Sequence, residues 1–311
     1  MAANDPIKVF YDRSNVRRKD RLILNPDEGS TLHWWLPESI EVAKHPLIEK
    51  KGLAAKHQLE LGQLYRFHYF TERLEYDAVN PVAQNIAMAC YGDLVLPPHY
   101  RQTASGIYVE EGFHALMSAD LMQQVSQATG CAPCFDSAPI FLDRLASIQD
   151  QVPVQLRELV KILFVVVSET LITHTFSDLP KDQRVVSLVR ENIRHHYEDE
   201  GRHAAFFTKF FETVWPQLTA EIKKTLGPLL PNLILSFCEA DYRSMGQDLG
   251  VIGFSKAECH EIITDCFPSH DVARNAKKAS AATIKLFERS GVLENARTEA
   301  AFFEAGLIDG S

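Results

Sequence analysis

Apolar residues recur at helical spacing along most of this chain. From about Leu53 onward they lie three and four residues apart, which is the pattern of helices that bury one face. The pattern predicts a first helix from about residue 53 to 96, interrupted near Pro81, because proline lacks the N–H that a helix interior needs. Proline and glycine then delimit a second helix over about 100–128, a short one over 139–148, and long ones over about 153–178 and from 182 to past 211.

The rest of the chain completes an all-α prediction. Further helices are expected over 217–247, with a break at Gly227-Pro228, and over 255–289, where Ser255 and Glu258 have the spacing of a capping box. Residues 1–45 are punctuated by proline, asparagine and glycine, which predicts an irregular arm lying over the body. No segments pair as strands. We therefore expect residues 1–52 to form an N-terminal arm and residues 53–311 to form a single domain.

Composition and charge exclude several classes of protein. The net charge of −9 argues against a nucleic-acid-binding surface. The longest apolar run, residues 162–167, is far shorter than the ~20 residues that span a bilayer. The N-terminus lacks the features of a secretory signal, and six cysteines in a chain of this length are expected to stay reduced. The sequence thus predicts a cytoplasmic protein without a membrane segment.

The most informative pattern is a repeated Glu-x-x-His, at Glu111/His114 and Glu200/His203. Residues three apart on a helix project to the same side, so each pair forms half of a metal clamp. His196 lies on the same helix face as the second pair. Glu169 falls within the apolar stripe of the third long helix, where an unpaired carboxylate would be costly. Two such clamps with two further glutamates make the dinuclear carboxylate site of four-helix bundles. The alternative for each segment alone is an ordinary charged helix face.

The first helix has to supply the remaining glutamate, and two candidates lie on its inward face. We favour Glu75 and keep Glu72 as the alternative. With a turn at 96–99, Glu111 lies about 12 residues after the turn and Glu75 about 21 before it. At ~1.5 Å per residue the two levels differ by more than ~10 Å, a gap that the interruption at Pro81 would have to absorb.

The predicted centre contains four carboxylates, three imidazoles and no thiolate, a donor set that suits iron or manganese better than zinc, magnesium or calcium. A histidine that binds a metal usually gives its second N–H to a carboxylate, which makes Glu110 and Asp199, with the adjacent Arg202, candidates for supporting roles. The predicted ligands are Glu75, Glu111, His114, Glu169, His196, Glu200 and His203.

This order of residues resembles the ferritin-like non-haem diiron N-oxygenases, the family of p-aminobenzoate N-oxygenase and arylamine oxygenase. The third histidine, His196, is the mark of that family, and the resemblance covers roughly residues 53–290. It implies a ferritin-like bundle and a homodimeric enzyme with two iron ions. It also implies that O₂ and an external electron donor, a protein or a small reductant, oxidise an amine nitrogen to hydroxylamine, or further to nitroso or nitro. His196 is then the catalytic residue, because it distinguishes this centre from that of ordinary ferritin-like oxidases.

The substrate is expected to be a small amine or an amino-acid-derived molecule of specialised-metabolite or signal biosynthesis. Arg274 is considered as a partner for a substrate carboxylate, with a surface arginine as the alternative. The other pocket candidates, each with an ordinary core position as the alternative, are Tyr65, His68, Tyr69, Tyr108, Phe113, Leu171, Ile172 and Thr175.

Two other functions compete with N-oxygenation. A diiron oxidase acting on carbon, such as a hydroxylase, desaturase or oxidative-cleavage enzyme, would share the bundle, and His196 is the feature against it. A non-catalytic ferritin-like iron-binding protein would have no reason to keep all seven ligand types. A zinc hydrolase is disfavoured because the chain lacks His-Glu-x-x-His.

Overall fold

The computed structural model describes residues 5–92, 94–171 and 178–309, and the side chains of all of these except 269–271. Within these ranges the chain is helical and forms no strand, apart from one isolated bridge between His33 and Val185. The predicted all-α class is confirmed. None of the described helices has both the length and the apolar character required to cross a lipid bilayer.

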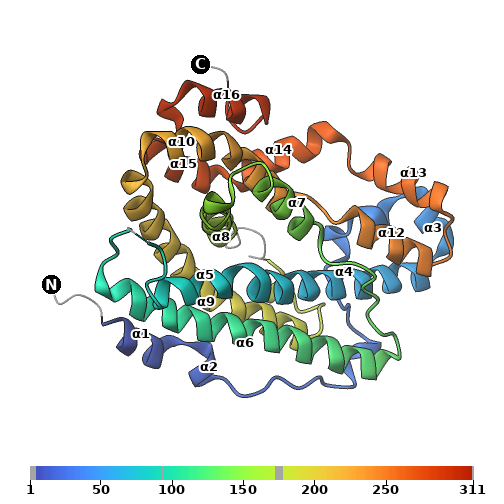
Figure 1. The fold of residues 1–311 in the computed structure, drawn as a ribbon. Coiled ribbons are helices and arrows are strands. Elements are labelled where there is room, and N and C mark those ends of the chain that lie inside the picture. Colours follow the sequence, from blue (N-terminus) through green and yellow to red (C-terminus); the bar gives the residue numbers. More distant parts are fainter. Residues whose placement is uncertain (1–4, 93, 172–177, 310–311) are drawn as a thin grey trace.

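Four long stretches of helix form the core around the candidate site. The first stretch, residues 53–87, packs along α6 (Pro98–Thr129), and α6 packs along α9 (Ser187–Val214). α8 (Arg157–Leu171) packs on α9 and on a π-helical segment of the first stretch (Glu75–Val79). Figure 1 shows the first stretch and α6 lying side by side, with α8 seen nearly end-on. These elements are α4 (Leu53–Leu74), a π-helical segment (Glu75–Val79), α5 (Asn80–Ala87), α6 (Pro98–Thr129), α8 (Arg157–Leu171) and α9 (Ser187–Val214).

The first helix differs from its prediction at two places, and proline explains one of them. Pro81 has no N–H to give to the Asp77 carbonyl, which instead accepts from Lys161 Nζ at 3.5 Å. The N–H of Asn80 bonds the carbonyl of Glu75, five residues back, so the turn widens into a π-helix and then continues as α5. The helix ends at Ala87 rather than near residue 96, and the expected longer helix is wrong.

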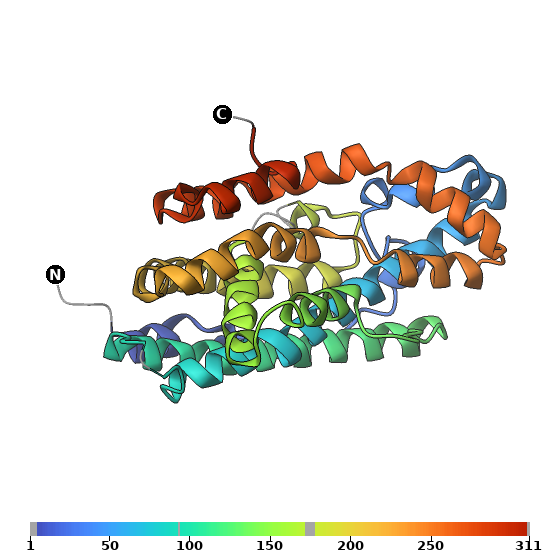
Figure 2. The same ribbon diagram turned by 45° about the horizontal axis from the view of Figure 1, so that its top comes forward.

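The C-terminal third adds further helices, as predicted, and they lie over one side of this core. Figure 2 shows them as a layer across the bundle, in which α11 and α15 contact α8. The helix expected over 255–289 is divided into three helices. The capping box at Ser255 and Glu258 is present at the start of α13. The helices that follow the first two core stretches and lie outside the core are α7 (Ile140–Gln149), α10 (Ala220–Leu226), α11 (Leu230–Cys238), α12 (Tyr242–Val251), α13 (Lys256–Cys266), α14 (Ser269–Ala279), α15 (Ala281–Arg289) and α16 (Ala296–Glu304).

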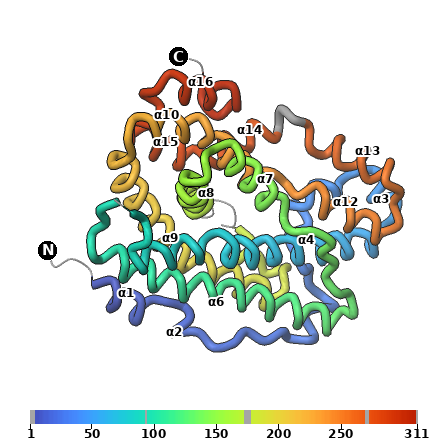
Figure 3. The backbone as a smooth tube through the Cα atoms, viewed as in Figure 1, coloured from blue at the N-terminus to red at the C-terminus, as the bar shows by residue number. Residues whose placement is uncertain are grey.

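The N-terminal arm is more ordered than the sequence predicts. It begins with α1 (Pro6–Arg13) and α2 (Asn15–Arg18), and a further helix, α3 (Pro46–Lys51), precedes α4. Asp5 starts α1 by accepting from the N–H groups of the first turn. Figure 3 shows α1 and α2 following the outer side of α6, which both contact. The expectation of an irregular arm is therefore wrong for these segments.

Candidate metal centre

Seven buried side chains from the four core stretches meet inside the bundle. All seven are less than about a tenth exposed. Their ligand atoms fall into two overlapping groups, each with all atoms within 4.8 Å of one another: Glu75, Glu111, His114 and His196, and Glu111, His114, Glu200 and His203. Glu169 joins them from α8, with its Oε2 3.9 Å from His203 Nδ1. The sequence named all of these residues, and the fold brings them together.

Glu111 lies between the two Glu-x-x-His histidines. Its Oε2 is 2.9 Å from His114 Nδ1, and its Oε1 is 2.8 Å from His203 Nδ1. His196 points into the same space, with Nε2 2.9 Å from Glu200 Oε1 and 3.7 Å from a carboxylate oxygen of Glu75. The stripe of α9 predicted from spacing therefore does face α6 and the π-helical segment.

Glu75 and Glu111 lie at the same height along the bundle axis because the first helix ends earlier than expected. Glu75 lies 12 residues before Ala87, the end of α5, and Glu111 lies 13 residues after Pro98, the start of α6. The described residues between the two helices, 88–92 and 94–97, are not helical and add no helical rise. Glu72, the alternative, is half-buried and belongs to neither group.

The buried carboxylates of the cluster have too few positive partners and hydrogen bonds among the side chains alone. Burial and repulsion from neighbouring glutamates raise the pKa of Glu75 and of Glu169 well above the usual value. Several inward atoms are buried without a hydrogen bond of good geometry: Glu75 Oε2, Glu169 Oε2, both Glu200 oxygens and His196 Nε2. Orphaned lone pairs of this kind are costly unless a cation binds them. The donor set therefore fits a pair of iron or manganese ions.

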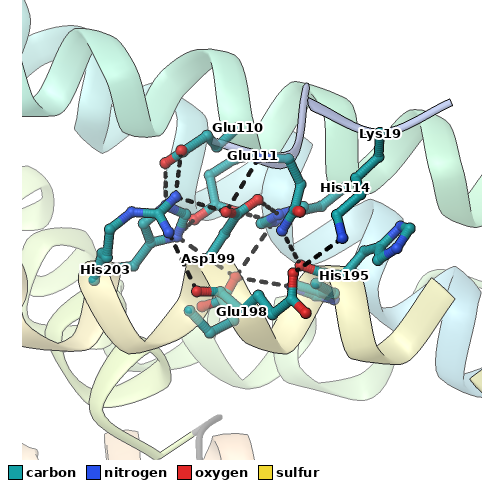
Figure 4. Close-up of polar contacts among 12 residues, drawn as sticks. Lys19, Glu110, Glu111, His114, His195, Glu198, Asp199 and His203 are labelled. Atoms are coloured by element: carbon teal, nitrogen blue, oxygen red, sulfur yellow. Dashed lines mark hydrogen bonds and ion pairs between the residues drawn. The ribbon is translucent and has the colours of Figure 1, made fainter. Parts of the chain in front are cut away.

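Each of the two Glu-x-x-His histidines is held from behind by a carboxylate. His114 Nε2 lies 3.2 Å from Asp199 Oδ2, and His203 Nε2 lies 2.7 Å from Glu110 Oε2. Arg202 joins these two carboxylates, with its Nη2 2.5 Å from Glu110 and 2.6 Å from Asp199. Figure 4 shows this network between α6 and α9.

These outer contacts set the direction of the rings. A neutral histidine that donates from Nε2 carries its lone pair on Nδ1, the nitrogen that faces the cluster in both His114 and His203. Carboxylates that fix the tautomer in this way are typical of metal-binding histidines. The three residues proposed from sequence for supporting roles, Glu110, Asp199 and Arg202, occupy these positions.

The predicted pocket residues are distributed over different parts of the molecule. Tyr65 is buried and donates to the carbonyl of Cys131 at 2.7 Å. His68 lies beside Ser118, with Nδ1 and Oγ 3.2 Å apart, and burial together with the nearby His196 lowers the pKa of His68 to about 3. Tyr108 is 43% exposed on the surface of α6. Phe113 faces a hollow under the arm, on the outer side of α6.

The remaining pocket candidates differ in whether they line a cavity. Arg274 is exposed on α14 and lines neither of the two cavities on that side of the molecule. Ile172 and Thr175 lie outside the described residues. Tyr69 and Leu171 do line a cavity, and Leu171 belongs to α8, the helix that carries Glu169.

That cavity has a volume of about 420 Å³ and a mostly apolar wall with six aromatic side chains. Its inner end includes Thr71, one helical turn before Glu75, and Leu171, two residues after Glu169. Arg66 is the one cation among its described lining residues. The aromatic lining consists of Phe67, Tyr69, Phe70, Phe237, Tyr242 and Phe267.

Comparison with known proteins agrees with this geometry. The model of a family described as p-aminobenzoate N-oxygenase AurF matches residues 33–291, which is most of the chain. A search of the curated proteins found no significant match. The predicted resemblance and the predicted ferritin-like bundle are both confirmed. This chain belongs to the p-aminobenzoate N-oxygenase AurF family, and it is a diiron N-oxygenase of that family.

Proposed function

We propose that the seven clustered side chains hold the two irons, and that the enzyme oxidises the amine nitrogen of a small molecule bound in the 420 Å³ cavity. One observation carries the proposal. Both Glu-x-x-His histidines present Nδ1 to the buried carboxylates while their outer nitrogens face Asp199 and Glu110, which is the arrangement that metal binding requires.

The iron pair, when bound, supplies the capacity to reduce O₂ by two electrons. The overall reaction is then balanced as an amine, O₂, two electrons and two protons giving a hydroxylamine and water. The electrons come from an external donor, and the nitrogen loses a hydrogen and gains a hydroxyl group. Repetition of this oxidation on the same nitrogen would lead towards nitroso and nitro products.

The residues of the chain divide the work around that reaction. His196 adds an imidazole donor beside the carboxyl groups of Glu200 and Glu75, and we propose it as the catalytic residue that distinguishes this centre. Glu110, Asp199 and Arg202 keep His114 and His203 in place. The surrounding core is apolar and excludes water, which strengthens the electrostatic interactions inside it.

The cavity supports a substrate whose amine is uncharged. Its wall is mostly apolar and contains six aromatic side chains, besides the charged Arg66, Glu239 and Asp241. The apolar part favours a flat or apolar molecule over an ammonium ion, which would lose its hydration there. An amine nitrogen must in any case keep its lone pair in order to accept oxygen. We therefore propose a neutral small amine as the substrate.

We also propose a homodimer and a cytoplasmic location. Large apolar side chains lie exposed on the outer face of α6, at Tyr108, Val109 and Leu116, and exposed apolar groups of this kind are typical of contact surfaces. All six cysteines are unpaired, which suits a reducing compartment that also supplies electrons.

The proposed function is tested with ¹⁸O₂ and the iron-loaded enzyme. With a chemical reductant and a panel of arylamines and amino acids, we expect two irons per chain and a product that is heavier than the amine by one ¹⁸O on nitrogen. Products that carry ¹⁸O on carbon would show that the enzyme is a carbon-oxidising diiron oxidase instead. Purified protein that binds zinc in preference to iron would refute the diiron assignment.

A further inference from the structure

We propose that Asn15, in the N-terminal arm, is a positioning residue of the metal centre that holds Asp199 and, through it, His114. The inference rests on the proposed iron site. Asn15 is 1% exposed although the arm lies on the surface. Its backbone N–H donates to Asp199 Oδ1 at 3.4 Å, and its side-chain Nδ2 donates to the carbonyl of His195 at 2.7 Å.

Asp199 is the link between the arm and the cluster. It is fully buried, so no solvent can hold its carboxylate in place. Its Oδ2 faces His114, while its Oδ1 accepts from both Arg202 and Asn15. A carboxylate with donors on both oxygens keeps one orientation, and its orientation decides which way the imidazole of His114 turns.

The arm contacts only one of the two carboxylates that lie behind the histidines. Glu110, behind His203, contacts Arg202 and that histidine, and no bond from the described part of the arm to Glu110 is present. Of the two outer carboxylates, Asn15 contacts Asp199. It also donates to the carbonyl of His195, in the turn of α9 just before His196. The arm therefore supports the side of the centre that contains His114.

Other contacts hold the arm on α6 and α9 at some distance from Asn15. Arg21 binds Asp120 through two nitrogens, at 2.9 and 2.6 Å, and Lys19 Nζ lies 3.7 Å from Glu198 Oε2. Figure 4 labels both Lys19 and Glu198. Phe10 of α1 packs so closely on α6 that a methyl group at Gly106 would lie 3.3 Å from its ring. These contacts anchor the arm on both sides of Asn15 without touching the cluster.

The chain allows a precise disruption by Asn15→Pro. Asn15 is the first residue of α2, a position where proline is well tolerated. Ser14 has φ −62° and ψ 132°, which is the extended conformation that a following proline requires. The substitution removes both donors at once, whereas Asn15→Ala removes only the bond to His195. Lys19→Ala and Arg21→Ala are matched controls that loosen the arm elsewhere.

The readout is binding of Co²⁺, whose visible spectrum reports the geometry of its ligands independently of turnover. Loss of a supporting residue around a metal site typically costs 10–100-fold in affinity, and because Asn15 is one donor among several we expect roughly three- to tenfold for Asn15→Pro. We expect an altered cobalt spectrum, a smaller effect for Asn15→Ala, and none for the two controls.

Several outcomes would overturn the inference. A folded Asn15→Pro with the cobalt affinity and spectrum of the wild type would do so, and so would equal losses in the two control variants. If Asn15→Pro fails to fold, Asn15→Asp replaces it, because a carboxylate of the same shape repels Asp199 and cannot donate to His195, and wild-type cobalt binding by that variant refutes the role. A wild-type protein that binds fewer than two cobalt ions contradicts the proposed function instead.

Discussion

Histidine and carboxylate side chains gather in two kinds of place among the described residues, and the contrast shows what makes a metal site. In the bundle interior, the two overlapping groups are fully buried. At the surface, His45 meets Glu261 and Asp265 of α13, whose carboxylates are exposed. The separation of the ligand atoms is similar in the two places, but the histidine rings present different nitrogens to the neighbouring carboxylates.

The difference lies in the second nitrogen of each ring. In the surface group, His45 Nδ1 accepts the N–H of Leu47 at the start of α3, so the proton of the neutral ring sits on Nε2, the atom that faces Asp265 at 3.4 Å. A metal would have to displace that proton and break the helix cap. In the interior, His114 and His203 give their outer nitrogens to carboxylates and keep lone pairs inward. Proximity alone therefore does not make a metal site.

The largest effect should come from His203→Ala, which removes an inward lone pair and takes one partner each from Glu110 and Glu111. We expect iron to fall from two per chain to fewer than one and turnover to be lost. Metal analysis after desalting measures this, with circular dichroism as the control for folding. Full iron occupancy in a folded variant would remove His203 from the ligand set.

A matched pair of glutamines should separate the two candidates on the first helix. Glu75→Gln takes away a carboxylate inside the cluster, whereas Glu72 lies outside it. We expect the first variant to lose iron affinity by more than about tenfold, the lower limit for residues that only support ligands, and the second to bind as the wild type does. The reverse result would show that Glu72 is the ligand.

His196→Ala should divide binding from turnover. Six of the proposed ligands remain in this variant, so we expect iron to be retained and the rate of N-oxygenation to fall by at least about tenfold. Metal content and single-turnover product yield, measured on one sample, give the two quantities. Wild-type turnover in this variant would refute a catalytic role for the third histidine.

Arg202→Gln tests the bridge behind the histidines. Glu110 and Asp199 both lose their cation, and we expect iron affinity to fall by about tenfold. Arg202→Lys keeps the charge but not the planar guanidinium group that reaches both carboxylates. The iron affinity of this variant should therefore lie between that of the wild type and that of Arg202→Gln. Equal affinities in all three proteins would mean that the bridge contributes nothing to metal binding.

Asp265→Asn is expected to have the smallest effect. The side chain of Asp265 is 61% exposed, and exposed pairs contribute about 0–1 kcal/mol to stability. Iron content and turnover should equal those of the wild type, and added zinc should raise the melting temperature of neither protein. A zinc-dependent stabilisation that Asp265→Asn abolishes would show that the surface group does bind metal.

Local spacing predicted much of the site, because helix periodicity alone places Glu111 beside His114, and His196 beside Glu200 and His203. It could not give the end of the first helix. Leu94, Val95 and Leu96 continue the apolar pattern beyond Ala87, although the chain has already left the helix. The π-helical turn before Pro81 is equally invisible to a pattern that assumes a constant period.

Contacts between distant segments were also beyond prediction. Asn15 lies 184 residues from Asp199, and nothing in its neighbourhood in the sequence indicates a role at the centre. The cavity depends on where Phe237 and Tyr242 pack against α4, which is why most of the pocket residues proposed from sequence do not line it. Only Tyr69 and Leu171, among the described candidates, do.

The order in which the ribosome makes this chain adds a constraint on assembly. The arm emerges first, since domains are synthesised from the N-terminus, yet Asn15 has no site partner until His195 and Asp199 exist. The same holds for Glu75 and Glu111, whose groups are completed by residues of α9. Iron insertion must therefore follow the synthesis of α9, and a nascent chain that ends before residue 195 has neither a complete centre nor the contacts that Asn15 makes.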